Sequence, residues 1–222
     1  LKDVDTCKHV LVTNEKISPM LFEHYNYTGM ELIERGNIKH IKRLYSKYIK
    51  FNNDTQHYLQ KEYERILQGK GKILGVLCRG TDYTMKRPAA HPVQPDPSDM
   101  MEKAKQVMLE KGCSYLYLAT EDEEIYTMFR SEFEGRLLTN DQMRFSKEDM
   151  QHVRQLFEIQ PKRAQDKYLR GLEYLTSMYL LSKCDSFIGG LTAGTVGVHL
   201  MSEGFEYDYV YKLGRYPEPS VK

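Results

Sequence analysis

The chain has 222 residues, of which 41% are hydrophobic and 28% charged, a composition typical of a soluble globular protein with one large domain or one domain and part of another. Its 32 basic and 31 acidic side chains give a net charge of +1, so no overall field favours nucleic acid or an anionic membrane as a partner. No apolar run approaches the about 20 residues that cross a bilayer, so we expect no transmembrane segment in this chain. We expect a cytoplasmic location, with peripheral attachment to the inner face of the membrane as the alternative.

The first part of the chain differs in pattern from the rest. A strand is predicted at 8–13, and apolar residues then recur with helical spacing in 38–48 and 58–67. Because the chain begins with Leu, we expect it to be a piece of a longer protein. We therefore interpret 1–70 as a mostly helical remnant of, or linker from, an N-terminal domain, and 71–222 as a second domain.

From residue 72 onward, short apolar runs alternate with amphipathic stretches. Strands are predicted at 72–78, 114–119, 135–139, 185–190 and 207–211. Helices are predicted at 98–111, 122–133, 166–183 and 194–203. This alternation suits right-handed crossovers and predicts an α/β fold with a parallel, doubly wound sheet. The polar segment 140–165 is predicted to be a mobile loop or a short irregular helix.

The cysteines show no metal-binding or disulfide pattern. Cys7, Cys78, Cys113 and Cys184 are far apart, form no C-x-x-C pair and lie mostly in apolar runs, so we expect reduced thiols. The sequence also lacks an H-E-x-x-H pattern, and we expect neither a metal nor another cofactor.

In open parallel sheets, ligands bind at the carboxyl ends of the strands. Arg79 follows the first predicted strand, where its planar guanidinium can donate two parallel hydrogen bonds to a phosphate, and Gly80 beside it would let a ligand approach the backbone. Thr81 and Asp82 complete this loop. The alternative is that Arg79 pairs with Asp82 and only ties down a turn.

Two further loops follow the strands at 114–119 and 185–190. Residues 189–195 bring Thr192, Gly194 and Thr195 to a helix N-terminus, which favours anions, although a plain turn with Thr192 or Thr195 as N-cap is the alternative. In the other loop, Thr120 and Glu123 have capping-box spacing, and Asp122 is expected to reach the crevice.

His91 lies in the proline-rich stretch 87–96, a place where an ordered histidine is often functional. It is a candidate proton acceptor, together with Asp82. The alternative is a simple loop histidine.

Several stretches together resemble a known family. These are LGVLCRGTDY (74–83), AAHPVQP (89–95), YLYLATEDEEIYTMF (115–129), YLRGLEYLTSMYLLSKCDSFIGG (168–190) and TAGTVGVHLMSEG (192–204). Their order resembles that of the α-1,6-fucosyltransferases of N-glycan cores and the nodulation-factor fucosyltransferases. The resemblance implies a glycosyltransferase-B architecture in which 71–222 is a Rossmann-like, donor-binding domain and 1–70 is the remnant of an acceptor domain.

The resemblance also implies roles for individual residues. Arg79 matches the arginine that binds the β-phosphate of GDP-fucose, and Asp82 and Asp122 match acidic residues of the adjoining loops. Thr192, or alternatively Thr195, falls where the family places hydroxyls on the diphosphate.

Three positions depart from the family pattern. Leu77 replaces a guanine-recognising histidine, and Arg87 lies near the position of the proposed general base. Ser177 replaces the guanine-binding aspartate, so Glu173, one helical turn earlier, would have to bind guanine in its place.

The function implied is metal-independent, inverting transfer of fucose from GDP-fucose to a hydroxyl of a glycan acceptor, for which we expect a microbial surface polysaccharide. Two alternatives stay open: a transferase that uses UDP- or ADP-sugars, and a non-catalytic module that binds a nucleotide or a glycan.

Overall fold

The computed structural model describes residues 33, 38–153, 155–161 and 163–217. The strand predicted at 8–13, and Cys7, lie outside these residues. The remaining cysteines, Cys78, Cys113 and Cys184, are buried with free thiols. None of the helices in the described part of the chain has the length and apolar character needed to span a bilayer.

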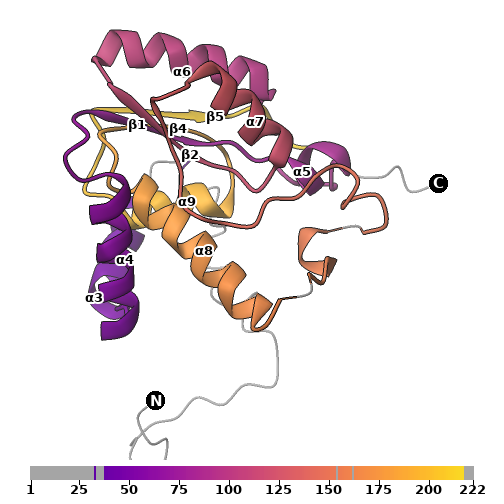
Figure 1. Ribbon diagram of the computed structural model, residues 1–222, viewed down its shortest axis with the longest axis horizontal. Helices are drawn as coiled ribbons and strands as arrows, with labels where there is room; N and C mark the ends of the chain where they lie inside the picture. Colours follow the sequence, from indigo (N-terminus) through magenta and orange to yellow (C-terminus); the bar gives the residue numbers. More distant parts are fainter. Residues whose placement is uncertain (1–32, 34–37, 154, 162, 218–222) are drawn as a thin grey trace, which may run out of the picture.

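A five-stranded parallel sheet forms the centre of the molecule (Figure 1). Its strands are β1 (Ile73–Leu77), β2 (Tyr115–Ala119), β3 (Leu137–Leu138), β4 (Ser186–Gly190) and β5 (Tyr207–Tyr211). The order is β3-β2-β1-β4-β5, so the chain builds outward from β1 in one direction and then returns to place β4 on its other side. The predicted α/β class and all five strands from residue 72 onward are confirmed, although β3 is shorter than expected. The reversal between β1 and β4 is the position where open sheets leave a crevice for ligands.

Helices cover both faces of the sheet (Figure 1). They are α3 (Ile38–Tyr48), α4 (Asn53–Ile66), α5 (Thr81–Met85), α6 (Pro97–Lys111), α7 (Glu123–Glu132), α8 (Asp166–Leu181) and α9 (Ala193–Met201). The long helices agree with the predicted ranges, whereas the short helix α5 was not expected. The ends of α6 show why local sequence places them well: Asp96 caps the first turn, Pro97 occupies it, and Gly112 ends the helix with a left-handed φ of 67°.

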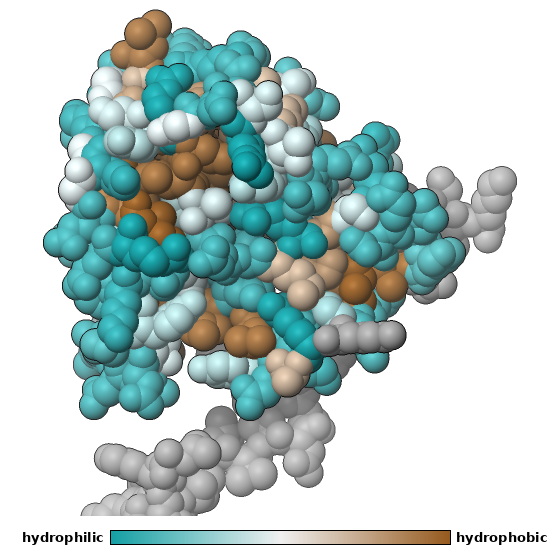
Figure 2. Space-filling model, in the orientation of Figure 1, coloured by the Kyte–Doolittle hydropathy of each residue, from teal (hydrophilic) through white to brown (hydrophobic). Residues whose placement is uncertain are grey.

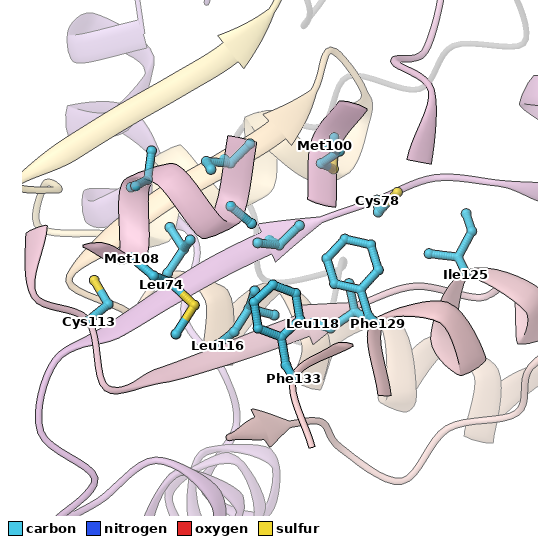
Figure 3. Packing of buried hydrophobic residues seen from close by; sticks show 14 residues of the cluster. Leu74, Cys78, Met100, Met108, Cys113, Leu116, Leu118, Ile125, Phe129 and Phe133 are labelled. Carbon is cyan, nitrogen blue, oxygen red and sulfur yellow. The ribbon is translucent and has the colours of Figure 1, made fainter. Parts of the chain in front are cut away.

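Two apolar clusters lie on opposite faces of β1. Leu74 and Val76 pack with Met100 and Phe129 beneath α6 and α7 (Figure 3). Ile73 and Leu77 belong to the cluster beneath α4, α8 and α9. Since successive strand residues point to opposite faces and both faces are covered, β1 is a continuous apolar run with every residue buried.

The segment between β3 and α8 packs against the domain rather than extending from it. It contains one 3₁₀ helix, η2 (Leu156–Glu158), which fits the predicted short irregular helix. Phe145 forms a parallel bridge with Asp122, and Phe145 and Met150 are buried. The segment therefore forms a wall beside the carboxyl ends of the strands.

Helices α3 and α4 share the core of the sheet domain. α3 packs on α9 and α4 on α8, and Ile66 and Leu67 join the cluster that contains Ile73. The boundary at 70/71 stays a prediction, but the helices that precede it contribute to the packing that supports β1.

Candidate functional site

A cavity of about 480 Å³ opens at the carboxyl ends of β1 and β2, between α8 and the segment that precedes it. The face of the molecule seen in Figure 2 is mostly hydrophilic, with apolar side chains gathered in a few patches. The lining combines apolar, amide and charged side chains: Leu77, Arg79, Ala119, Thr120, Glu121, Gln142, Met143, Phe145, Leu156, Lys167, Arg170, Glu173, Tyr174, Ser177 and Met178. Such a mixture suits an organic ligand that carries an anionic group.

Arg79 lines this cavity and is held on two sides. Its Nε lies 3.4 Å from Oε1 of Glu121, and its guanidinium lies 4.7 Å from the centre of the Tyr83 ring. Only 16% of the Arg79 side chain is exposed. An ion pair and an aromatic face fix the plane of the guanidinium, which prepares it to bind a planar or tetrahedral anion. The side chain of Asp82, the partner considered from the sequence, lies outside the described part of the structure.

The backbone donors beside Arg79 are already used inside the protein. The Gly80 N–H donates to Glu121 Oε1 at 3.1 Å, and the Thr81 N–H donates to Asp122 Oδ2 at 3.0 Å. The Thr81 hydroxyl also donates to Glu121. A Cβ on Gly80 would lie 2.2 Å from Asp122 Oδ2, so the glycine makes room for Asp122. The approach of a ligand to the Gly80 backbone stays a prediction.

Asp122 caps α7 and does not line the cavity. Its Oδ1 accepts from the Glu124 and Ile125 N–H groups, at 2.9 and 3.0 Å, and the residue is buried. The predicted Thr120–Glu123 capping box is wrong because Asp122 takes the N-cap position, while the Thr120 hydroxyl accepts from the Asp122 N–H. The Asp122 carboxylate, two residues further along the chain than Thr120, satisfies the unpaired N–H donors of the first turn of α7.

The polar groups of the loop after β4 are also hydrogen-bonded within the protein. Thr192 is the N-cap of α9 and accepts from the Thr195 N–H at 3.2 Å, as the structural alternative predicted. The Thr195 hydroxyl donates to a carbonyl of β4, and both threonines are buried. A Cβ on Gly194 would lie 2.7 Å from the Tyr174 hydroxyl and 2.9 Å from Met178 Sδ. These loop residues are not among those that line the cavity, and their role in binding a diphosphate stays a prediction.

His91 lies near Arg79 but outside the cavity lining. Its exposed ring meets Tyr83 edge to face at 5.7 Å, and Nδ1 is 3.0 Å from the Ala89 carbonyl oxygen. The Tyr83 ring, which contacts both His91 and the Arg79 guanidinium, therefore lies between His91 and the cavity. Its role as a proton acceptor stays a prediction.

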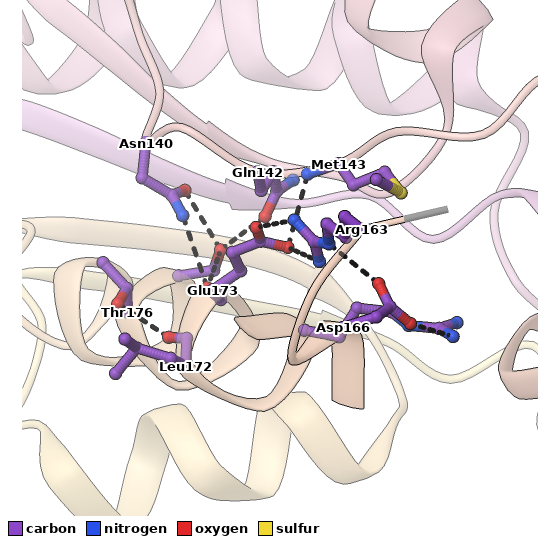
Figure 4. Close-up of polar contacts among 10 residues, drawn as sticks. Asn140, Gln142, Met143, Arg163, Asp166, Leu172, Glu173 and Thr176 are labelled. Atoms are coloured by element: carbon purple, nitrogen blue, oxygen red, sulfur yellow. Dashed lines mark hydrogen bonds and ion pairs between the residues drawn. The ribbon is translucent and has the colours of Figure 1, made fainter. Parts of the chain in front are cut away.

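Glu173 lines the cavity and is bound on both carboxylate oxygens (Figure 4). Arg163 Nη1 donates to Oε1 at 2.6 Å, and Nη2 donates to Oε2 at 3.1 Å. The Met143 N–H also points to Oε2, at 3.4 Å. Nearby, the Ser177 hydroxyl donates to Gln142 Oε1 at 2.7 Å.

Five polar lining residues were given no role from the sequence: Glu121, Gln142, Lys167, Arg170 and Tyr174. The signal for Glu121 was its place directly after β2, the same signal that drew attention to Asp122. The phenol of Tyr174 lies against Gly194, and desolvation there raises its pKa despite an opposing influence of Arg79, so it is a hydrogen-bond donor at neutral pH. Among the described residues, no group of three or more His, Cys, Asp or Glu side chains is arranged to hold a metal ion.

Fold and site together define an α/β domain with a Rossmann-like parallel sheet and a cavity at its carboxyl edge. No family model matches the sequence, and no curated protein is significantly similar to it.

Similar solved structures include fucosyltransferases. NodZ alpha-1,6-fucosyltransferase soaked with GDP-fucose is 20% identical, with a TM-score of 0.44 over 72% of this chain and 46% of that chain. NodZ from Bradyrhizobium is 14% identical, with a TM-score of 0.43 over 72% and 44%. POFUT1 in complex with GDP is 8% identical, with a TM-score of 0.47 over 74% and 49%. The chain thus spans about half the length of these structures, and likeness at this level does not establish what the cavity binds.

Proposed function

We propose that the chain is the donor-binding part of a glycosyltransferase that transfers fucose from GDP-fucose to a hydroxyl of a glycan acceptor. The observation that carries the proposal is Arg79, which follows β1 at the edge of a cavity of about 480 Å³ with its guanidinium held by Glu121 and Tyr83. The sequence resemblance and the GDP and GDP-fucose named for the similar structures support this donor.

In the proposed reaction, the acceptor hydroxyl oxygen forms a bond to the anomeric carbon as the bond from that carbon to the diphosphate breaks. Charge then builds on the departing diphosphate, where a fixed guanidinium stabilises it most. Arg79 would bind this group, and the Tyr174 hydroxyl is a further donor on the same cavity wall. The hydroxyl proton would pass to Asp82 or His91, and inversion follows from a single displacement.

A non-catalytic nucleotide- or glycan-binding module is the second candidate. The hydrogen bonding in the loops after β1 and β4 favours this candidate. The Gly80 and Thr81 N–H groups and the Thr195 hydroxyl are bonded within the protein, so they are not free to stabilise a departing diphosphate. Such a module would bind the ligand without turnover. A different nucleotide-sugar donor is the remaining alternative within the transferase class.

Nucleotide-dependent melting tests the donor. Binding to the native state raises stability by about 2.7 kcal/mol at a ligand concentration of 100 times Kd. We expect GDP to raise the melting temperature more than UDP, ADP or NAD at the same millimolar concentration. Equal shifts for all four, or none with GDP, would contradict the donor assignment.

Metal independence is tested separately. Because Arg79 supplies a positive charge at the proposed diphosphate site, we expect GDP binding and any turnover to be unchanged after treatment with EDTA. Loss of binding that magnesium or manganese restores would show that the donor is held through a metal.

A further inference from the structure

Glu173 lies on the cavity wall formed by α8 and is ion-paired with Arg163, which precedes α8 in the chain. The two side chains are 19% and 23% exposed, and both guanidinium Nη atoms bind the two carboxylate oxygens, at 2.6 and 3.1 Å (Figure 4). Glu173 is a lining residue of the cavity. A carboxylate with both oxygens aimed in one direction is a receptor for a pair of parallel N–H donors.

The edge of guanine presents such a pair. Its N1–H and N2–H are carried on an N–C–N unit of the same kind as the donor fork of a guanidinium, whereas the pairing edges of uracil and adenine lack two adjacent donors. Arg163 therefore occupies Glu173 in the way that guanine would. Guanine and the Arg163 guanidinium would each bind end-on to the same lone pairs of the Glu173 carboxylate. The two groups therefore cannot bind Glu173 at the same time.

Arg163 has a second partner that would hold it when it leaves Glu173. Its Nε donates to Asp166 Oδ1 at 2.8 Å, and Asp166 is also anchored by Arg170. An exchange of partners would thus not leave the Arg163 charge without a counter-ion, which keeps the cost of the exchange small.

We propose that Arg163 is an intramolecular competitor for guanine at Glu173, and hence a specificity-determining residue of the nucleotide site. The inference rests on the proposed function. The competition lowers the affinity for GDP. It also reduces the difference in affinity between GDP and nucleotides that do not bind the Glu173 carboxylate. Uridine and adenosine diphosphates are not affected by it.

Calorimetry with GDP, inosine diphosphate, UDP and ADP at pH 8 tests the competition, since at that pH an unpaired carboxylate stays ionised. Inosine diphosphate keeps N1–H and lacks the 2-amino group. In Arg163→Met we expect GDP to bind about tenfold or more tightly than in the wild type, because guanine no longer has to displace the charged hydrogen bonds of Arg163 from Glu173. Inosine diphosphate should gain less, and UDP and ADP should be unchanged.

Three further variants serve as controls. Arg170→Met removes the other arginine bound to Asp166 and should leave the ratio of GDP to inosine diphosphate affinity unchanged. Arg163→Lys keeps a charge but loses the planar fork, so it should give a smaller gain for GDP in the same direction. Glu173→Gln, alone or combined with Arg163→Met, should bring that ratio close to one.

Two results would overturn the proposed competition. One is an equal change in affinity for all four nucleotides in Arg163→Met, and the other is the same gain in GDP affinity when Arg163→Met is combined with Glu173→Gln. If Arg163→Met does not fold, Arg163→Lys and Glu173→Gln decide the question by the same ratio. Failure of every protein to bind any nucleoside diphosphate would instead refute the proposed function.

Discussion

At the residue scale, the site depends on carboxylates that organise the loops around one arginine. Glu121 accepts from the Gly80 N–H and the Thr81 hydroxyl and pairs with Arg79, while Asp122 accepts from the Thr81 N–H and caps α7. These contacts join the loops after β1 and β2. In the proposed function, phosphate binding would therefore depend on the Arg79 side chain more than on the backbone donors of its loop.

Arg79→Ala tests that dependence. If Arg79 binds the departing diphosphate, turnover should fall about 100-fold or more, and GDP affinity should fall with it, since a charge-assisted contact is lost where charge develops. Arg79→Lys should recover only part of the loss because it lacks the planar fork. Turnover, calorimetry and melting temperature are measured on the same preparations.

Glu121→Gln is the matched control for the structural part of the effect. It removes the ion pair but keeps Arg79, so its melting temperature reports the contribution of the pair. An Arg79→Ala protein that melts at lower temperature but binds GDP normally would show that Arg79 is only a structural tie.

At the element scale, a histidine joins α9 to the edge strand β5. His199 Nδ1 lies 2.8 Å from the Thr195 carbonyl oxygen, and Nε2 lies 2.8 Å from Asp208 Oδ2. The ring also packs edge to face against Phe187 and Phe205. Since both nitrogens face acceptors, only the doubly protonated ring can donate to each.

The pKa of His199 is raised in the folded protein. Burial, the largest influence, lowers it, and Lys42 on α3 lowers it too, but the hydrogen bonds to Asp208 and to the Thr195 carbonyl, with the Asp208 charge, outweigh them. The unfolded reference pKa is 6.5. The stabilisation is therefore complete below about pH 6.5 and is lost as the pH rises through the higher pKa of the folded state.

Asp208→Asn tests this pH dependence. Chemical unfolding at a series of pH values from 5.5 to 9 should show a wild-type advantage of about 1 kcal/mol or less at low pH, because Asp208 is 42% exposed. That advantage should disappear at high pH. A difference in the free energy of unfolding that is constant across the series would contradict a titrating His199–Asp208 pair.

At the scale of the whole molecule, the described residues form one sheet covered on both faces, with α3 and α4 packed on α9 and α8. The cavity opens at the carboxyl ends of β1 and β2, between α8 and the segment that precedes it. The chain spans about half the length of the similar solved structures. The proposed transfer between two substrates would require a closed cleft that excludes water, and we expect the acceptor side of that cleft to lie outside residues 71–222.

We therefore expect residues 1–222 alone to bind GDP but to transfer fucose poorly to any glycan acceptor. The measurement compares GDP affinity by calorimetry with the release of GDP from GDP-fucose in the presence of acceptor glycans. Efficient transfer by these residues alone would contradict the assignment of the acceptor site to a separate domain.

Apart from the short helix α5, the sequence by itself determined the order and type of the helices and strands from residue 72 onward. Periodicity suffices there because a doubly covered parallel strand must be continuously apolar, as in β1, and because caps such as Asp96 and Gly112 act through local backbone geometry. The position of Arg79 at the mouth of a crevice follows from the same rule about strand ends.

Only the tertiary structure decided which polar groups face the cavity. Gly80, Asp122, Thr192 and Thr195 have the residue types of a phosphate site, yet each is used for packing or capping within the protein. Glu121 lines the cavity, whereas its neighbour in the sequence, Asp122, caps α7. Whether a side chain caps a helix, pairs with an arginine or lines a cavity depends on partners such as Arg163 and Glu173, and sequence spacing does not specify those contacts.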